Sequence, residues 1–350
     1  MTGYDALSGR RILVTGHTGF KGSWLSLWLA QLDAAVSGFA LDPQTPLFDD
    51  AKVAGGLVND IRGDVRDLAA VENVIAQCRP QLVIHLAAQP LVRASYADPV
   101  GTISTNVLGT THVLDAVRRA TAPCPVLVVT SDKVYAVAGR ESGNTEDDAL
   151  GGHDPYSASK AAAEIVAGAW RSSFPEVPVA TARAGNVIGG GDTATDRLMP
   201  DVVRALSAGQ PIVVRNKKSV RPWQHVLDAL HGYLLVGAGL LSADAEKFAR
   251  AWNFGPVGRP LPVSDVVDLA IDAWGNGEWR DGSDDAAPPE EPALLVDPRR
   301  AVAGLGWAPR WDITTAVAKT VGWHRAVEAG ANPADACAVD IEDWTTTARA

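Results

Sequence analysis

The sequence is poor in the features that mark disulfide frameworks, metal centres and membrane spans. Its three cysteines, Cys78, Cys124 and Cys337, have neither paired metal-ligand spacing nor a disulfide-framework count, which suits a reducing cytoplasm. Met1 to Arg11 contains no signal-peptide hydrophobic region, and no apolar run approaches about 18 residues, the length of a transmembrane helix. We therefore expect a soluble cytoplasmic protein that holds no metal ion and has no membrane partner.

Positive charge is also scarce. The chain has 31 Lys and Arg against 41 Asp and Glu, a formal net charge of -10 and a sequence pI near 5.2. This balance argues against nucleic acid as a partner, so any anionic ligand must be held by local arginines, lysines and backbone amides. At 350 residues, 47% of them apolar, the chain is long enough for one large α/β unit or two unequal domains.

Glycines recur at three-residue steps directly after the first apolar run. Arg11–Thr15 is predicted to be a strand, and a helix is expected from Ser23 to Gln31. Between them, Gly16 allows a tight turn, Gly19 lets the backbone approach a pyrophosphate, and Gly22 lets the helix pack against the strand. The spacing G-x-x-G-x-x-G in this strand-turn-helix context predicts a dinucleotide-binding turn.

The end of the second strand, Val36–Leu41, is expected to select the cofactor. An acidic residue there would accept from ribose hydroxyls, whereas an arginine would meet a 2′-phosphate. Ala40 stands where an acid is expected, and Asp42, two positions later, is either the ribose ligand or an ordinary turn residue before Pro43. No Lys or Arg occurs between Asp33 and Asp50, which favours NAD over NADP.

Two further strand ends complete the expected cofactor site. A strand near Leu57–Ile61 leads to Asp64, which is placed to accept from the adenine amino group. The strand Leu82–Leu86 ends in Ala87-Ala88, whose small side chains let a cofactor lie against the backbone. His85, inside that apolar strand, is predicted to be a core residue with satisfied hydrogen bonds and not a catalyst.

Strands and helices alternate regularly as far as the middle of the chain. A helix from Pro99 to about Arg119 carries Asn106 and precedes the apolar, β-branched run Val126–Val129, which is typical of a buried parallel strand. This alternation implies right-handed crossovers around a Rossmann-type, doubly wound parallel sheet.

Polar residues with catalytic potential follow that central strand. Ser131-Asp132-Lys133 stands at its carboxyl end, where chemistry is placed in open α/β sheets. Tyr156 and Lys160 are four residues apart in a helical segment and so share one helix face. A neighbouring ammonium favours phenolate, so we expect Lys160 to lower the pKa of Tyr156 from about 10 and let Tyr156 act as a general base.

Together these motifs resemble the extended short-chain dehydrogenase/reductase superfamily over essentially the whole chain. Within it, the strings GHTGFKGSWL (16–25), HLAAQPLVR (85–93), SDK (131–133), GGHDPYS (151–157), RAGNVIGGGD (183–192) and RPWQHV (221–226) resemble the CDP-glucose 4,6-dehydratases. The resemblance implies NAD as cofactor, held by Gly16, Thr18, Gly19, Phe20, Gly22, Asp42, Asp64, Val65, Leu86, Ala87, Ala88, Asn106, Tyr156 and Lys160. It implies a nucleotide-sugar substrate, CDP-glucose being favoured, held by Gln89, Arg93, Asn186, Arg215 and Arg221.

Two domains are expected on this basis. Residues 1–186 would form the NAD-binding Rossmann domain, with segments near 223–255 returning to it, and residues 187–350 a smaller C-terminal α/β domain that binds the nucleotide sugar. The tail after Ala329 is rich in small residues and is expected to run extended over the surface or to be partly mobile. The resemblance also implies a homodimer or homotetramer formed through helices near 100–118 and 157–173.

The dehydratase resemblance gives each polar residue at the central strand end a role. Tyr156, supported by Lys160 and Ser131, would remove the C4 hydroxyl proton, Lys133 would be the base at C5, and Asp132 the acid at C6, yielding CDP-4-keto-6-deoxy-D-glucose from CDP-D-glucose. An epimerase or decarboxylase of the same fold needs no acid-base pair beside Ser131. A non-catalytic, NAD-binding regulatory protein would be expected to lack Tyr156 or Lys160. Both alternatives stay open at this point.

Overall fold

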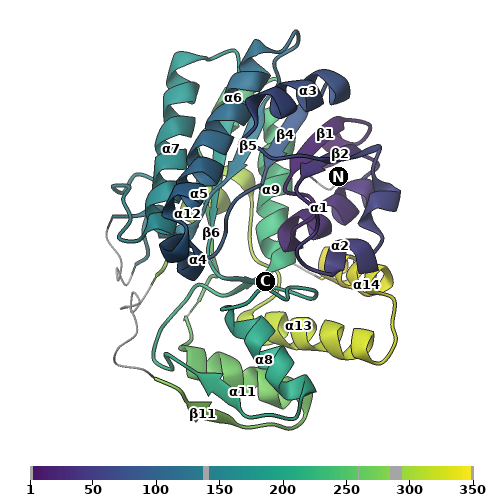
Figure 1. The fold of residues 1–350 in the computed structure, drawn as a ribbon, viewed down its shortest axis with the longest axis vertical. Coiled ribbons are helices and arrows are strands. Elements are labelled where there is room, and N and C mark those ends of the chain that lie inside the picture. Colours follow the sequence, from purple (N-terminus) through teal and green to yellow (C-terminus); the bar gives the residue numbers. More distant parts are fainter. Residues whose placement is uncertain (1–2, 137–141, 259, 284–293, 348–350) are drawn as a thin grey trace.

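The computed structural model describes residues 3–136, 142–258, 260–283 and 294–347, and they build an α/β fold around a seven-stranded parallel sheet (Figure 1). The strand order is β10-β6-β5-β4-β1-β2-β3. Because β1 pairs with both β2 and β4, the order reverses there, and this switch point is where ligands bind in open α/β sheets. The strands are β1 (Arg11–Thr15), β2 (Ala35–Ala40), β3 (Asn59–Arg62), β4 (Leu82–His85), β5 (Val126–Val129), β6 (Val179–Ala184) and β10 (Ala251–Phe254). The predicted Rossmann-type sheet is confirmed.

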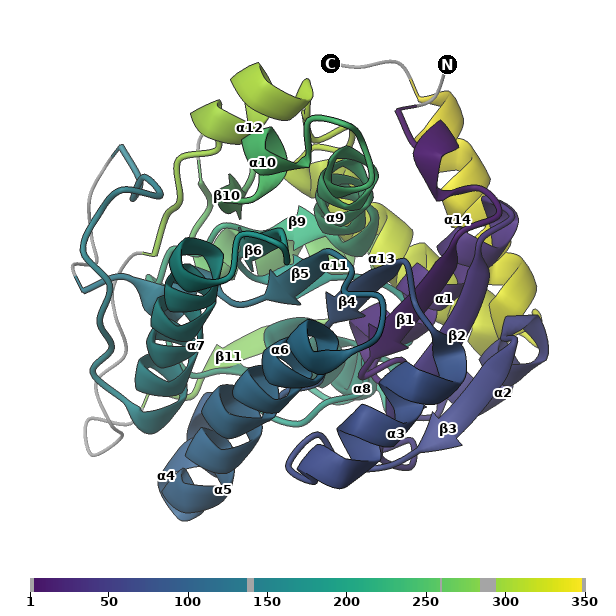
Figure 2. The same ribbon diagram turned by 90° about the horizontal axis from the view of Figure 1, so that it is seen from above.

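Helices cover both faces of the sheet, and the inner strands β1, β4 and β5 are accordingly mostly apolar. On β1, Ile12 and Val14 point into one core cluster and Leu13 into the other. Figure 2 shows α9 on one side of the sheet and α6 and α7 on the opposite side. The main covering helices are α1 (Phe20–Gln31) and α9 (Val226–Leu240) on one face, and α3 (Leu68–Cys78), α6 (Gly109–Arg119) and α7 (Pro155–Ser173) on the other.

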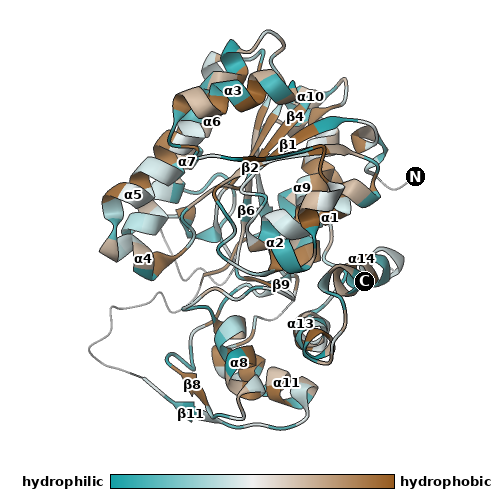
Figure 3. Ribbon diagram, turned by 45° about the vertical axis from the view of Figure 1, so that its right-hand side comes forward, coloured by the Kyte–Doolittle hydropathy of each residue, from teal (hydrophilic) through white to brown (hydrophobic). Residues whose placement is uncertain are grey.

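A second, smaller α/β part lies beyond the carboxyl ends of the strands, at the bottom of Figure 1. Its apolar residues form a cluster separate from the two that flank the large sheet. In Figure 3 its elements lie apart from the large sheet, below it. It contains α8 (Leu198–Ser207), β8 (Ile212–Val214), α11 (Val263–Trp274), β11 (Trp279–Asp281) and α13 (Ile313–Glu328), with β11 parallel to β8. A short parallel pair, β7 (Val187–Ile188) and β9 (Gln224–His225), stands between the two parts.

The prediction that the tail after Ala329 is extended or partly mobile is wrong. Residues Pro333–Thr346 form α14, whose start is fixed by Pro333 in its first turn and by Asn332, which accepts a hydrogen bond from the Ala334 amide. Trp344 is fully buried and meets the Trp28 ring edge-on at 5.2 Å between centroids. The small-residue composition of this segment concealed a few large side chains that dock it onto α1.

Short elements connect these units. They are η1 (Asp5–Leu7), α2 (Leu47–Asp50), η2 (Val53–Gly56), α4 (Val92–Ala97), α5 (Pro99–Ile103), the π-helical turn η3 (Ser104–Leu108), η4 (Asp132–Val134), α10 (Ala245–Phe248) and α12 (Arg299–Leu305). Within the described residues, none of the helices combines the length and the apolarity that crossing a membrane requires.

Candidate active site

The glycine turn after β1 is built for a ligand. Gly16 has φ +73°, and a Cβ there would lie 2.6 Å from the Ala87 amide nitrogen. A Cβ at Gly22 would lie 2.1 Å from the Gly16 carbonyl oxygen, so the protein itself requires both glycines. At Gly19, the N-cap of α1, the nearest atom would be 3.4 Å away, an ordinary contact. Because the protein leaves room there, the open space and the helix N-terminal amides fit a dinucleotide pyrophosphate.

Thr18 and Phe20, on either side of Gly19, contact other segments of the protein through their side chains. Thr18 donates its hydroxyl to the Leu41 carbonyl at 3.0 Å, which ties the turn to the end of β2. Phe20 is buried, and its ring lies 3.2 Å from the position that a Cβ on Gly189 would take. Thr18 and Phe20 therefore shape the turn through their side chains, and their backbone amides are what remains for a cofactor.

A cation lies beside the end of β2 in three dimensions, although no Lys or Arg occurs between Asp33 and Asp50 in the sequence. Arg62, from β3, places its Nε 3.4 Å from Asp42 Oδ1 and its guanidinium over the Phe48 ring. Asp42 is 91% exposed, so this ion pair is readily exchanged. Ala40, where an acid was expected, is buried. The end of β2 thus carries both an acid and a cation, and the cation was missed because it comes from the adjacent strand.

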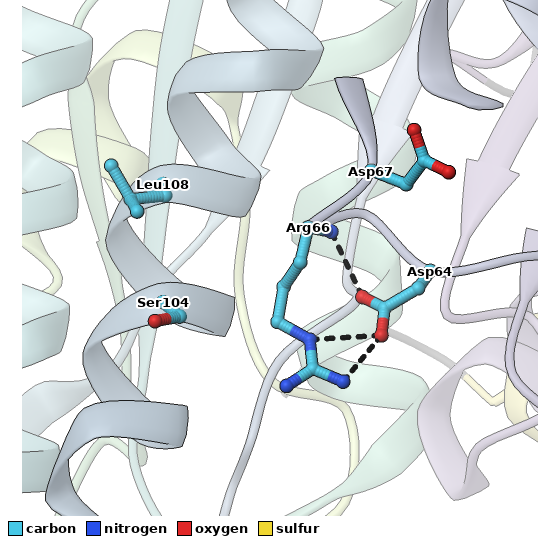
Figure 4. A pocket seen from close by; sticks show the side chains of 5 residues that line it. All are labelled: Asp64, Arg66, Asp67, Ser104 and Leu108. Carbon is cyan, nitrogen blue, oxygen red and sulfur yellow. Dashed lines mark hydrogen bonds and ion pairs between the residues drawn. The ribbon is translucent and has the colours of Figure 1, made fainter. Parts of the chain in front are cut away.

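A cavity of about 430 Å³ opens beside β3. In Figure 4, Asp64 and Arg66 face each other there, and Ser104 and Leu108 line the opposite wall from the π-helical turn. Arg66 donates to Asp64 from its amide and its guanidinium, and these bonds lower the pKa of the Asp64 carboxyl. Asp64 thus meets a ligand already paired with Arg66, a partner that the sequence did not reveal.

Val65 is buried between this cavity and α6. Its carbonyl pairs with the His112 ring at 2.9 Å, and its side chain fills the space that Gly109 leaves open.

Asn106 lies in the π-helical turn that interrupts the predicted helix Pro99 to Arg119. Its side chain accepts from the Gln89 amide at 2.8 Å and donates to the Gln89 carbonyl and to the Ser159 hydroxyl. Turns of this type recur at functional sites because they redirect one side chain. Asn106 thereby joins the end of β4 to the first turn of α7.

The surroundings of His85, the last residue of β4, are as predicted. His85 is buried between the hydroxyls of Thr15 and Thr110, at 2.7 and 3.1 Å, and burial lowers its pKa to about 3. It is a satisfied core residue. Residues 86–88 are partly exposed, and the Ala87 amide donates to the Thr15 hydroxyl.

The three residues after β5 form a compact polar group. Ser131 caps η4 by accepting from the Lys133 amide, and it donates to Asp132 Oδ1 at 3.0 Å. Lys133 Nζ lies 3.4 Å from the same oxygen. Asp132 is 3% exposed, yet its Oδ2 has no hydrogen-bond partner in the described structure. A buried carboxylate oxygen without a partner is costly, and this one stands among other titratable groups at the end of a strand.

Tyr156 and Lys160 flank that group from α7, whose N-cap Asp154 bonds the Ser157 amide. The Tyr156 hydroxyl is hydrogen-bonded to Ser131. The predicted lowering of the Tyr156 pKa by Lys160 is wrong. Burial raises the pKa of Tyr156, while the hydrogen bond to Ser131 opposes the rise. Lys160 donates to the Val129 carbonyl at 3.3 Å, and burial lowers its own pKa to about 8.

Two cations near this centre were missed by sequence reasoning. Lys21, inside the glycine motif, is in electrostatic contact with Lys160 and Asp132. Arg197, just before α8, acts on both Lys21 and Tyr156 and pairs with Asp192 at 3.2 Å. The position of Lys21 between two motif residues was a usable signal. Nothing in the sequence distinguished Arg197 from a surface arginine.

The expected substrate residues divide into two groups. Arg93 and Arg215 converge on one carboxylate, that of Asp196, at 3.4 and 2.7 Å, although they come from distant segments. Arg221 is buried, and it donates to the Val220 carbonyl.

Gln89 and Asn186 lie just beyond strands of the large sheet, Gln89 after β4 and Asn186 after β6. The Gln89 side chain is hydrogen-bonded to the Leu91 backbone and to the Thr102 hydroxyl, so it stabilises its own loop. Asn186 is partly exposed just before β7, and its carbonyl accepts from the Gln224 amide.

Comparison with known proteins agrees with this geometry. Residues 12–248 match the NAD dependent epimerase/dehydratase family. The curated CDP-glucose 4,6-dehydratase of Salmonella typhimurium strain LT2 is 45% identical over 330 residues, covering 91% of each chain.

Two solved structures share the fold over nearly their whole length. DesIV, a dTDP-glucose 4,6-dehydratase from Streptomyces venezuelae with NAD and TYD bound, has a TM-score of 0.78 and 25% identity, with 92% of this chain and 99% of that chain covered. UDP-glucose 4-epimerase of Thermus thermophilus in complex with NAD has the same TM-score and identity, over 90% and 98%. A dehydratase and an epimerase are equally similar in fold, so the site residues must decide between them.

Proposed function

Because the chain belongs to the NAD dependent epimerase/dehydratase family, we propose that it is an NAD-dependent nucleotide-sugar 4,6-dehydratase, a hydro-lyase that converts CDP-D-glucose to CDP-4-keto-6-deoxy-D-glucose. The choice of CDP-glucose is supported by the 45% identity to the Salmonella enzyme over nearly the full length. The choice of dehydration over epimerisation is supported by the side chains after β5.

The observation that carries the proposal is the acid-base pair beside Ser131. Asp132 presents one buried oxygen with no hydrogen-bond partner in the described structure, and Lys133 lies 3.4 Å from its other oxygen. An epimerase needs Tyr156 and Lys160 but no such pair. A non-catalytic protein would have no reason to keep this carboxylate together with Ser131, Lys133 and Tyr156 at one strand end.

The glycine turn, the partly exposed residues 86–88 and the Asp64 cavity would hold NAD. When bound, NAD supplies a hydride acceptor for oxidation at C4 and a hydride donor for reduction at C6. Tyr156 accepts the C4 hydroxyl proton, assisted by Ser131 and Lys160. Because burial raises the Tyr156 pKa, this transfer depends on the positive charges that adjoin it in the loaded site.

Elimination then uses the pair after β5. Lys133 takes the C5 proton, which the C4 ketone acidifies, and Asp132 protonates the C6 hydroxyl as it leaves as water. On the substrate side, Arg93, Arg215 and Arg221 supply positive charge for the nucleotide diphosphate, and Asn186 is a further polar group for the substrate. Arg93 and Arg215 must exchange Asp196 for the ligand.

Assembly and location complete the proposal. Val100, Ile103 and Ile165 are 75%, 40% and 60% exposed on α5 and α7, an apolar surface that supports pairing of two copies through these helices, as a dimer or a dimer of dimers. The three cysteines are free thiols in the described structure, which supports a cytoplasmic location.

The proposal is tested by Lys133→Ala with CDP-glucose. This variant keeps Tyr156 and Lys160, so C4 oxidation should proceed and the reduced cofactor should accumulate, visible by its absorbance, while 4-keto-6-deoxy product falls about 10²- to 10⁴-fold. Tyr156→Phe is the control, because it should prevent the reduced cofactor from forming. If Lys133→Ala formed product at nearly the wild-type rate, from CDP-glucose or another nucleotide-glucose, Lys133 would not be the base at C5.

A further inference from the structure

Lys21 occupies a position that the proposed chemistry does not use. It stands in the first turn of α1, between Phe20 and Gly22 of the cofactor turn. Trp24, three residues on and therefore on the same helix face, donates its indole N–H to the Gly190 carbonyl at 2.9 Å. The Lys21 side chain consequently lies at the boundary where the glycine turn meets residues 189–197.

Four charged groups act on the Lys21 ammonium, and none of them neutralises it. Arg197 and Lys160 are cations, and Asp132 and Asp192 are acids. Asp192 is already paired with Arg197, and Asp132 with Lys133. Among the described residues, Lys21 has no hydrogen bond or ion pair of its own.

These surroundings make the charged form of Lys21 less favourable, which lowers its pKa. Burial, followed by the repulsion from Arg197 and Lys160, lowers its pKa to about 7. Lys21 is partly exposed, and an amine that is fully protonated only below neutral pH weakens the fold, whereas an apolar residue of similar length would not. Positive charge is otherwise scarce in this acidic chain, so three cations gathered at one boundary indicate an anionic ligand.

We propose that Lys21 is an anion-binding residue of the active site, whose ammonium binds a phosphate group of a nucleotide held between the glycine turn and residues 189–197. Two nucleotides can supply that phosphate, the cofactor and the nucleotide sugar, and the second of these rests on the function proposed above. A phosphate oxygen would complete the charge-assisted hydrogen bond that the protein leaves unmade.

Binding measurements on Lys21→Met test this without turnover. The protein with its bound cofactor is titrated with CDP, and the protein stripped of nucleotide on charcoal is titrated with NAD. Loss of a charge-assisted hydrogen bond should weaken one of the two affinities roughly 10- to 100-fold. The ligand that weakens identifies the source of the phosphate. Lys247→Met, which removes an exposed lysine from α10, is the matched control and should change neither affinity.

Proton uptake gives a second readout that a merely structural lysine would not move. Because phosphate binding favours the charged amine, wild-type protein at about pH 8 should take up a proton through Lys21 as the nucleotide binds, measured by calorimetry in buffers of different ionisation enthalpy. This uptake should be reduced in Lys21→Met. Lys21→Arg should recover the affinity but not the uptake, because arginine stays protonated.

Unchanged affinities for both NAD and CDP in Lys21→Met would overturn the assignment. If Lys21→Met does not fold, wild-type proton uptake decides: no uptake with either nucleotide would overturn it as well. If wild-type protein does not bind CDP, the substrate proposal fails, while the NAD titration still tests Lys21. The two failures are therefore distinguishable.

Discussion

Asp132 and Asp228 are buried aspartates that each leave one oxygen without a hydrogen-bond partner in the described structure, and their surroundings differ. Asp132, at the end of β5, has its Oδ1 beside the Ser131 hydroxyl and the Lys133 ammonium, whereas its Oδ2 has no hydrogen-bond partner among the described residues. Asp228, in α9, has its Oδ1 bonded by the Arg310 amide at 2.7 Å and the Trp344 indole at 2.9 Å. The first carboxylate stands among titratable groups, and the second is enclosed by a backbone amide and tryptophan rings.

The comparison shows that an unsatisfied buried oxygen does not by itself mark a catalytic group. Burial raises the pKa of Asp228 to about 7, so this carboxylate strains the fold although it has no part in the proposed reaction. Its bonded oxygen joins α9 to the segment around Arg310 and to α14. What distinguishes Asp132 is the lysine and the serine-tyrosine pair that share its site.

The largest effect is expected at Asp132. Asp132→Asn removes the acid for C6 elimination, so product formation should fall about 10²- to 10⁴-fold, while the C5 proton should still exchange in deuterated water. Mass spectrometry of recovered substrate measures that exchange. A variant that forms product at the wild-type rate would place Asp132 with Asp228, as a structural carboxylate.

The second prediction concerns pH and Asp228. Its folded pKa, about 7, lies above its usual value of 3.8, so the folded state binds more protons between these values. Its stabilising contribution is therefore complete below the lower value and is lost as pH rises to the higher one. Asp228→Asn keeps the Oδ1 acceptor and should remove up to about 1.4 kcal/mol per pH unit from the pH dependence of the unfolding free energy in that window.

Denaturant titrations of both proteins across that window measure the slope. Turnover of Asp228→Asn with CDP-glucose at neutral pH should match the wild type for the folded fraction, in contrast to Asp132→Asn. Parallel stability curves for wild type and Asp228→Asn would show that Asp228 is ionised equally in the folded and unfolded states.

The smallest effect is expected where a carboxylate is exposed and paired. Asp42 is 91% exposed beside Arg62, and such pairs contribute about 0 to 1 kcal/mol. Asp42→Asn should leave Arg62 paired with Asp60 but not with Asp42, and should raise the affinity for NADP a few-fold, while the affinity for NAD falls by a similar factor or stays unchanged. Equilibrium titration with each cofactor measures both. Asp49→Asn, nearby and without such a pair in the described structure, is the control. A stronger preference for NAD in Asp42→Asn would contradict this assignment.

The residues found from sequence and those missed differ in how far apart their partners lie. Gly16, Gly19 and Gly22 form one local turn, and Tyr156 and Lys160 share one helix face, so spacing alone brought them together. Arg62, Arg66 and Arg197 were missed because no local pattern separates them from surface charges. The fold was predictable because the alternation of strands and helices is also a local property.

The error over Tyr156 has a different origin. A lysine four residues away should lower its pKa, but both side chains are buried, and desolvation outweighs the expected charge effect. The spacing of two residues in the sequence shows that their side chains are close together, but it does not show whether they are buried away from water. The prediction for the tail after Ala329 was wrong for a related reason, because the average composition of the tail does not show that Trp344 is buried.

The contact between Trp344 and Trp28 has a consequence for synthesis of the protein. The first helix leaves the ribosome early, and the last one is made after every strand of the large sheet has been translated. Until then Trp28 lacks one of the rings that cover it, and α1 borders the cofactor turn. The nucleotide-binding half can therefore reach its final packing only after translation has passed α14, and until then the part of Trp28 that Trp344 covers is exposed.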